Sequence, residues 1–159
     1  MINIVYKSIV KKIVIVICFV SISSAIQAQK TFDPAHTKAI NEAILNYVEG
    51  VYELDTARIY SSVHPELAKR GFAYNKNNAA WSSKMEMNFP QLVDLTKNWN
   101  KSGTRANKQS VRTVEIFDIQ DKTASAKVTA AWGTDYFHLA YIDNKWLIVN
   151  VLWQTPPVK

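Results

Sequence analysis

Two ionisable side chains interrupt the most strand-like segment of the chain, TDYFHLAYIDNKWLIVNVLW at residues 134–153. Asp135 and His138 could each exchange protons with a substrate, and the pKa of an unperturbed histidine lies near neutrality. Successive side chains of a strand point to opposite faces of a sheet. We therefore expect at most one of the two to face a pocket, with Asp135 on the face of Phe137 and Leu139.

Each of the polar candidates also has a purely structural interpretation. Asp135 follows Gly133 closely, so its carboxylate either braces that turn or lies in a pocket, where an unpaired charge would be costly. His64 precedes Pro65 and either faces the mouth of a pocket or closes a helix. His138 is either a pocket residue or an ordinary outward-facing or interface residue. The sequence therefore assigns no catalytic residue.

Other familiar chemistries lack the residues that they need. The chain has three histidines, His36, His64 and His138, and none stands at a spacing typical of metal ligands. Its glycines form no phosphate-binding loop, and no GxSxG nucleophile elbow occurs. We expect neither a metal nor a cofactor, and the sequence leans away from an enzyme.

Aromatic residues are the stronger indication of a binding site. Aromatic walls with a few polar groups suit a flat organic ligand, although they equally suit the core of a small domain. The candidates for a ligand pocket are aromatic or polar residues of the predicted elements: Tyr47, Tyr60, His64, Tyr74, Trp81, Trp132, Asp135, Tyr136, His138 and Trp153.

The first 28 residues have the features of a secretory signal peptide. Lys7, Lys11 and Lys12 precede the apolar run IVIVICFVSISSA, and Ala28 is a small residue at a suitable cleavage point. The run is shorter than the roughly 20 apolar residues of a membrane-spanning helix. We expect cleavage after Ala28 and export to the periplasm or the outside, with no membrane contact afterwards.

Removal of this segment changes the charge and the redox chemistry of the chain. The segment holds three of the 19 basic residues and none of the 13 acidic ones, so the net charge falls from +6 to +3. This weak charge favours no nucleic-acid partner. Cys18 is lost as well, which excludes disulfides and thiolate sites from the mature protein. Residues 29–34 are expected to be a linker and residues 35–157 one domain.

Hydrophobic periodicity predicts helices first and strands afterwards. Asp33 and Pro34 are typical of a helix start, and Asp55 is expected to cap a second helix with Ile59, Tyr60 and Val63 inward. Helices are predicted within residues 31–55, 55–64 and 83–101. Strands are predicted at 68–75, 111–120, 123–132, 134–142 and 145–155. This order is typical of an α+β domain with helices on one face of a curved sheet.

The order and spacing of these segments resemble the nuclear-transport-factor-2-like (NTF2-like) superfamily. The residues that carry the resemblance are Gly50, Asp55, His64-Pro65, Asp135 and Trp146, within YVEGVYELDTARI, VHPEL and TDYFHLAYIDNKWLIVN. More narrowly, the chain is similar to a bacterial family labelled "putative lumazine-binding". The resemblance covers roughly residues 35–157.

The resemblance implies a cone-shaped half-barrel, in which a curved antiparallel sheet wraps around a long N-terminal helix and two further helices. A pocket is expected between the sheet and the helices. The superfamily includes enzymes, such as ketosteroid isomerase and scytalone dehydratase, and non-catalytic modules, so no catalytic residues are carried over.

Three functions follow as expectations. The first is an exported domain that binds a small aromatic or heterocyclic molecule. The second is an acid–base enzyme of the isomerase, dehydratase or hydrolase type that uses a pocket histidine or aspartate. The third is a homodimeric interaction module, with Lys127, Thr129 and His138 at the interface.

Overall fold

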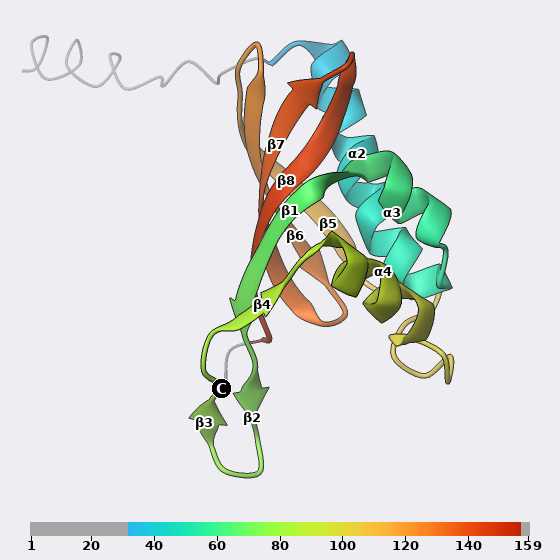
Figure 1. Cartoon of the computed structure of the whole chain (residues 1–159), viewed down its shortest axis with the longest axis vertical. Coiled ribbons are helices and arrows are strands. Elements are labelled where there is room, and N and C mark those ends of the chain that lie inside the picture. The colour runs from blue at the N-terminus through green and yellow to red at the C-terminus, as the bar shows by residue number, and fades with distance from the viewer. Residues whose placement is uncertain (1–31, 157–159) are drawn as a thin grey trace, which may run out of the picture. The chain divides into compact units, whose positions relative to one another are not determined.

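The computed structural model describes residues 32–156, in which three helices lie against a curved sheet (Figure 1). The elements are, in chain order, α2 (Pro34–Glu53), α3 (Thr56–Ser62), β1 (Val63–Phe72), β2 (Tyr74–Asn75), β3 (Ala80–Trp81), β4 (Met85–Met87), α4 (Phe89–Asn98), β5 (Arg112–Ile119), β6 (Thr123–Ala130), β7 (Gly133–Ile142) and β8 (Lys145–Gln154). The expected signal peptide lies outside the described residues. Among the helices of residues 32–156, none is long and apolar enough to cross a membrane.

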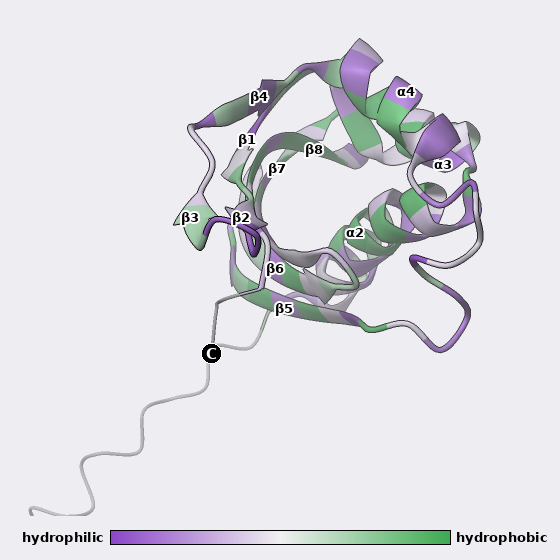
Figure 2. Ribbon diagram, turned by 90° about the horizontal axis from the view of Figure 1, so that it is seen from below, coloured by the Kyte–Doolittle hydropathy of each residue, from purple (hydrophilic) through white to green (hydrophobic). Residues whose placement is uncertain are grey.

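Six strands form the main sheet in the order β4-β1-β8-β7-β6-β5. Strand β1 is parallel to β8, and every other pair in this sheet is antiparallel. The sheet bends into an open arc, and α2 and α4 lie on its concave side (Figure 2). The predicted α+β half-barrel is confirmed.

Helix α2 begins where its sequence predicts and buries one face against the sheet. The Asp33 side chain accepts a hydrogen bond from the Ala35 backbone N–H at 2.8 Å, and Pro34 occupies the first turn. The buried face includes Ile40, Ile44, Tyr47, Val48 and Val51. Small residues on β6, among them the buried Ala124 and Ala126, let the helix pack closely on the sheet.

The long strands alternate between the two faces of the sheet as predicted. On β7, Asp135, Phe137 and Leu139 are buried, whereas Tyr136 and His138 are exposed. The turn between β7 and β8 consists of residues 143–144, which separate the two predicted strands, and both residues have positive φ, 48° and 59°. Asp135 and His138 therefore lie on opposite faces, and Asp135 is the inward one.

The third predicted helix begins later than expected. Residues 85–87 form strand β4, which pairs with β1, and α4 starts only at Phe89. Helix α4 does not begin earlier because Asn88 is its N-cap residue. Its side chain accepts from the Gln91 N–H at 3.1 Å, and the Gln91 side chain accepts from the Asn88 N–H at 2.9 Å.

The short strand predicted at 68–75 is in fact the end of a longer one. Strand β1 begins at Val63 and contains Pro65, next to a register shift in its pairing with β8 where a missing N–H is tolerated. The chain then continues into a hairpin of β2 and β3, which projects beyond the main sheet (Figure 1). Two-residue strands leave no periodicity in the sequence, so this hairpin was not predicted.

The expected inward orientation of Tyr60 and the expected end of strand β6 are both wrong. Tyr60 does not point inward, because its side chain is 62% exposed and only its neighbour Ile59 fills the core. Successive helical residues diverge by about 100°, and in this short helix the Tyr60 ring instead packs edge-on against Phe89 of α4, with ring centroids 5.2 Å apart. Strand β6 ends at Ala130 rather than Trp132, since the Ala131 N–H leaves the ladder to donate to the Tyr52 hydroxyl at 2.6 Å.

Candidate functional site: an aromatic cavity with a buried lysine

A cavity of about 230 Å³ lies between the concave sheet face and the helices. Four aromatic rings contribute to its wall, those of Tyr47, Trp99, Trp132 and Trp153. The two methionines of β4, Met85 and Met87, also line the cavity. The remaining lining residues are Val51, Lys69, Ala73, Leu95 and Thr155. Thioether side chains adapt to ligand shape, and aromatic rings offer flat faces. The wall therefore suits a planar organic molecule.

Strand register brings the polar groups of the cavity together. Asp135 on β7 pairs with Trp153 on β8, and Trp153 pairs with Gly71 on β1. Lys69 lies two residues before Gly71, so it projects from the same face of β1. Three strands thus place a carboxylate, an indole and an amine side by side on the concave face.

Lys69 supplies the only charged side chain among the residues that line this cavity. Its side chain is 6% exposed. Its Nζ lies 5.4 Å from the ring centroid of Tyr47 and 5.5 Å from that of Trp153, which are cation–π distances. The ammonium group is therefore held between two aromatic rings.

Asp135 lies directly behind the cavity wall, where it is completely buried. One oxygen, Oδ2, accepts from the Tyr47 hydroxyl at 3.0 Å and from Lys69 Nζ at 3.2 Å. The other, Oδ1, accepts from Trp132 Nε1 at 2.7 Å. Lys69 Nζ also donates to the Tyr47 hydroxyl at 2.6 Å. The buried charge of Asp135 is therefore paired and hydrogen-bonded, and its partners are the residues of the wall.

Burial changes the proton affinities of two groups in this network. Loss of hydration lowers the pKa of Lys69, although the neighbouring Asp135 carboxylate opposes this change. Loss of hydration also raises the pKa of Tyr47 well above its ordinary value, and Asp135 adds to that increase. Tyr47 is consequently a neutral phenol that donates to Asp135, and Lys69 is easier to deprotonate than a solvated lysine.

Four of the residues proposed from the sequence lie at this cavity. Tyr47, Trp132 and Trp153 line it, and Asp135 contacts three residues of its wall. Asp135 also braces the turn after β6 through Trp132. Asp135 therefore lies behind the cavity wall rather than in it, and its contact with Trp132 fits the turn-brace interpretation.

The other six proposed residues lie elsewhere. Tyr74 and Trp81 pack on each other in the β2–β3 hairpin, with ring centroids 5.4 Å apart. Tyr60 is on the outer side of α3, and His64 lies near the start of β1. Tyr136 and His138 are on the outer face of the sheet. An acid–base site would thus depend on Asp135, Tyr47 and Lys69, without a histidine.

Lys69 is the charged cavity residue that sequence reasoning missed, and the aromatic Trp99 was missed as well. Alternation along β1 buries Leu67, Lys69 and Gly71 and would have placed the lysine inward. This alternation did not lead to a prediction for Lys69, because lysine side chains are mostly exposed to solvent. Met85 and Met87 were missed because residues 83–101 were assigned to a helix.

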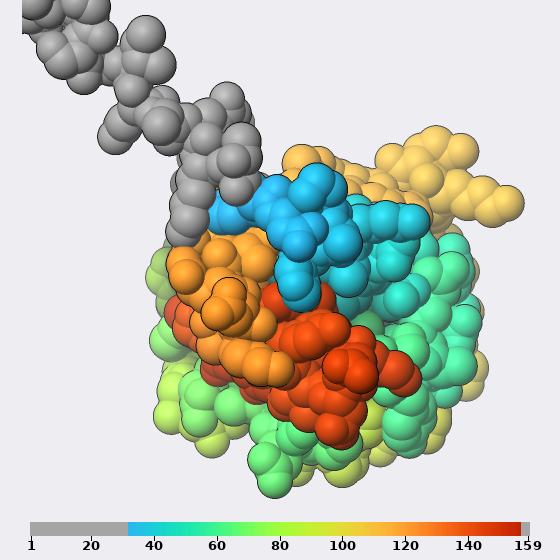
Figure 3. Space-filling model, turned by 90° about the horizontal axis from the view of Figure 1, so that it is seen from above, coloured from blue at the N-terminus to red at the C-terminus, as the bar shows by residue number. Residues whose placement is uncertain are grey.

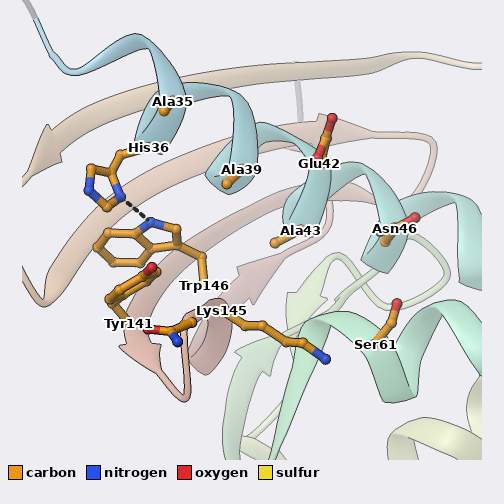
Figure 4. A pocket seen from close by; sticks show the side chains of 11 residues that line it. Ala35, His36, Ala39, Glu42, Ala43, Asn46, Ser61, Tyr141, Lys145 and Trp146 are labelled. Atoms are coloured by element: carbon orange, nitrogen blue, oxygen red, sulfur yellow. Dashed lines mark hydrogen bonds between the residues drawn. The ribbon is translucent and has the colours of Figure 1, made fainter.

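A second hollow of about 330 Å³ lies between the start of α2 and the β7–β8 turn. Figure 3 shows the first turns of α2, in blue, next to this turn, in red-orange. His36 Nδ1 accepts from Trp146 Nε1 at 2.8 Å on its wall (Figure 4). Its charged residues, Glu42 and Lys145, are exposed, so water weakens their attraction for a ligand. The aromatic cavity is therefore the better candidate site.

Comparison with known proteins agrees with this architecture. A family model described as "Putative lumazine-binding" matches residues 35–154. No curated protein matches the chain.

Solved structures share the fold at low sequence identity. An NTF2-like protein of unknown function from Shewanella baltica OS155 is 21% identical, with a TM-score of 0.61, over 81% of this chain and 100% of that one. An NTF-2 like protein of unknown function from Silicibacter pomeroyi DSS-3 is 12% identical, with a TM-score of 0.56, over 77% and 97%. A protein of unknown function with a cystatin-like fold from Nostoc punctiforme PCC 73102 is 11% identical, with a TM-score of 0.51, over 80% and 96%. The predicted NTF2-like fold is confirmed.

Proposed function

Because the chain belongs to the NTF2-like family described as "Putative lumazine-binding", we propose that it binds a small, flat aromatic or heterocyclic molecule beside Lys69. The observation that carries the proposal is one buried amine in a cavity otherwise walled mainly by aromatic and apolar side chains. Apolar walls with one well-placed polar group are the usual design of a small-molecule site. The walls supply affinity, and the amine selects ligands with a hydrogen-bond acceptor.

The size of the cavity limits the ligand. A volume of about 230 Å³ is below the roughly 300–1,000 Å³ of pockets for drug-sized molecules. One ring or two fused rings fit this space. Lumazine, which the family description names, is a fused two-ring heterocycle with carbonyl groups. A carbonyl oxygen of such a ligand can accept from Lys69 Nζ while its rings stack on Trp153 or Trp99.

The protein that binds this ligand is proposed to be an exported one. The support is the segment of residues 1–28, with its basic start, short apolar run and Ala28. Export to the periplasm or the outside would expose the cavity to small molecules taken up or released by the cell.

A homodimer is proposed through the outer face of the sheet. Three large apolar side chains are exposed there, Phe117 by 44%, Tyr136 by 46% and Leu152 by 48%. The rings of Phe117 and Tyr136 lie 6.5 Å apart, so the apolar surface is continuous between them. Contiguous apolar surface is typical of interaction sites. The outer face lies on the opposite side of the sheet from the cavity, so the protein can form a dimer and bind a ligand at the same time.

The dimer is tested by placing a charge on that face. Leu152→Asp should weaken the dimer at least about tenfold, because an interface core excludes unpaired charges. Sedimentation equilibrium over a range of concentrations measures the change. Gln109→Asp, exposed in the loop before β5 and away from that face, is the matched control and should leave the dimer intact. Wild-type protein that stays monomeric at all concentrations would refute the proposal.

Native mass spectrometry of the exported protein tests ligand binding. The full chain is expressed, collected outside the cytoplasm and sprayed without denaturation. We expect a chain that begins at Gln29 and carries one bound small molecule, which is then identified from its mass. Wild-type protein should retain this molecule during the measurement, because the aromatic walls and Lys69 both bind it.

A paired variant supplies the control for that measurement. Lys69→Met combined with Asp135→Asn removes the amine without leaving an unpaired buried charge, and it should lose the bound mass. Lys145→Met changes an exposed lysine and should retain it. Binding that is equal in all three proteins would place the ligand outside this cavity, and a chain that still contains residues 1–28 would refute export by cleavage.

A further inference from the structure

We propose that Lys69 forms a covalent imine with the carbonyl carbon of an aromatic aldehyde or ketone that enters the aromatic cavity. This inference rests on the proposed function, since the carbonyl compound must first bind there. It adds to that function a reversible chemical bond, which would make the protein a covalent carrier or trap for carbonyl compounds.

The position of Lys69 is the first argument. It is the one primary amine among the residues that line the cavity, and its side chain is 6% exposed. Its Nζ lies beside the rings of Tyr47 and Trp153, about equally far from both. A planar ligand that stacks on Trp153 therefore brings its substituents close to the amine. Bound reactants held in contact react as if their concentrations were very high.

The environment of Lys69 is the second argument. Imine formation needs a neutral amine, and a solvated lysine is almost wholly protonated at neutral pH. Burial lowers the pKa of Lys69, so a larger fraction of this amine is neutral than in a solvated lysine. Lysines that form Schiff bases are typically activated by desolvation in apolar pockets.

A path for the proton is the third argument. Asp135 Oδ2 lies 3.2 Å from Lys69 Nζ and can accept its proton directly. The Tyr47 hydroxyl accepts from Nζ at 2.6 Å and donates to Asp135 at 3.0 Å, so it also connects the two groups. Trp132 Nε1 occupies the other carboxylate oxygen and holds Asp135 in place. The same network can return the proton later.

The reaction balances with the groups present. The Lys69 ammonium gives one proton to Asp135, and the nitrogen lone pair then attacks the carbonyl carbon. A C–N bond forms as the C=O π bond breaks and its electron pair moves onto the oxygen. A second N–H proton passes to the oxygen, which gives a neutral carbinolamine. The C–O bond breaks as Asp135 returns its proton to the leaving hydroxyl group, and water departs. The product is a protonated imine whose positive charge faces the Asp135 carboxylate, as the ammonium did.

Reductive trapping tests this inference. The exported protein is incubated with 2-naphthaldehyde at neutral pH, reduced with sodium cyanoborohydride, and mapped by peptide mass spectrometry. We expect one naphthylmethyl group on Lys69, formed at least about tenfold faster than on Lys145, since the cavity holds the bound aldehyde in contact with this amine. The Lys69→Met/Asp135→Asn variant should lose this rapid adduct. Mapping of the wild-type protein decides the site even if that variant folds poorly.

A ligand without a carbonyl group separates the two proposals. 2-Naphthalenemethanol has the same rings and cannot form an imine, and its binding is followed by quenching of tryptophan fluorescence. If it binds while Lys69 remains unmodified by the aldehyde, or is modified no faster than exposed lysines, the covalent inference is overturned and the binding cavity stands. If neither compound binds, both proposals are overturned for aromatic rings of this size.

Discussion

Asp135→Asn should lower the free energy of unfolding by about 3 kcal/mol, because it leaves the Lys69 ammonium buried without an anionic partner. The substitution hardly changes the shape of the side chain, so the loss is electrostatic rather than steric. Asp135 is fully buried behind the cavity wall and accepts from three side chains, all of which belong to residues of that wall. Urea denaturation followed by tryptophan fluorescence measures the effect.

Two further variants distinguish pairing from packing. Combining Asp135→Asn with Lys69→Met removes both charges. We expect the double variant to recover most of the lost stability, because neither a buried ammonium nor a buried carboxylate then remains. Glu115→Gln breaks the ion pair with Lys127, 2.6 Å long but on the outer face of the sheet, and should change stability little. A single Asp135→Asn variant as stable as Glu115→Gln would mean that the buried lysine is not charged.

Gly71→Ala should lower the free energy of unfolding by about 3 kcal/mol and abolish ligand binding, through overpacking beside Trp153. A methyl group at this position would lie 2.3 Å from the Trp153 carbonyl oxygen and 2.4 Å from an indole carbon. Because one of these atoms belongs to the backbone of β8, the strand itself must move. The displaced indole would no longer form its part of the cavity wall. Urea denaturation and fluorescence titration with 2-naphthalenemethanol measure the two losses.

Gly103→Ala is the matched control for this substitution. Gly103 has a φ of +70°, and an added methyl group there would meet nothing within 4 Å. Its cost is the strain of a left-handed backbone alone, about 1 kcal/mol, and ligand binding should persist. Gly71 itself has no positive φ, so the contact with Trp153 is the expected cause of its loss. A loss at Gly71→Ala no larger than that at Gly103→Ala would show that β8 and Trp153 move aside at little cost, and it would contradict the prediction.

The features that sequence reasoning predicted well depend on neighbours in the chain. Asp33 caps α2 through a residue two positions later, and Asp55 caps α3 in the same way. The turn at residues 143–144 follows from two residues that tolerate positive φ. Such geometry is determined within a few residues, so it can be predicted locally.

The features that were missed depend on partners distant in the sequence. Residues 85–87 become a strand only because β1 offers them a free edge, and helical periodicity could not show this. The same applies to Pro65, which lies inside β1 where the register against β8 shifts. Strand pairing between remote segments carries no local signature beyond alternation.

The candidate site shows the same division. Alternation along β7 determined by itself that Asp135 points inward and His138 outward, because side chains of a strand must point to opposite faces. Only the tertiary structure decided that Lys69 meets Asp135, since 66 residues separate them along the chain. Their contact depends on the parallel pairing of β1 with β8, which brings the lysine across the concave face. The cavity is therefore a product of sheet order, and its chemistry comes from a charge pair that no single segment contains.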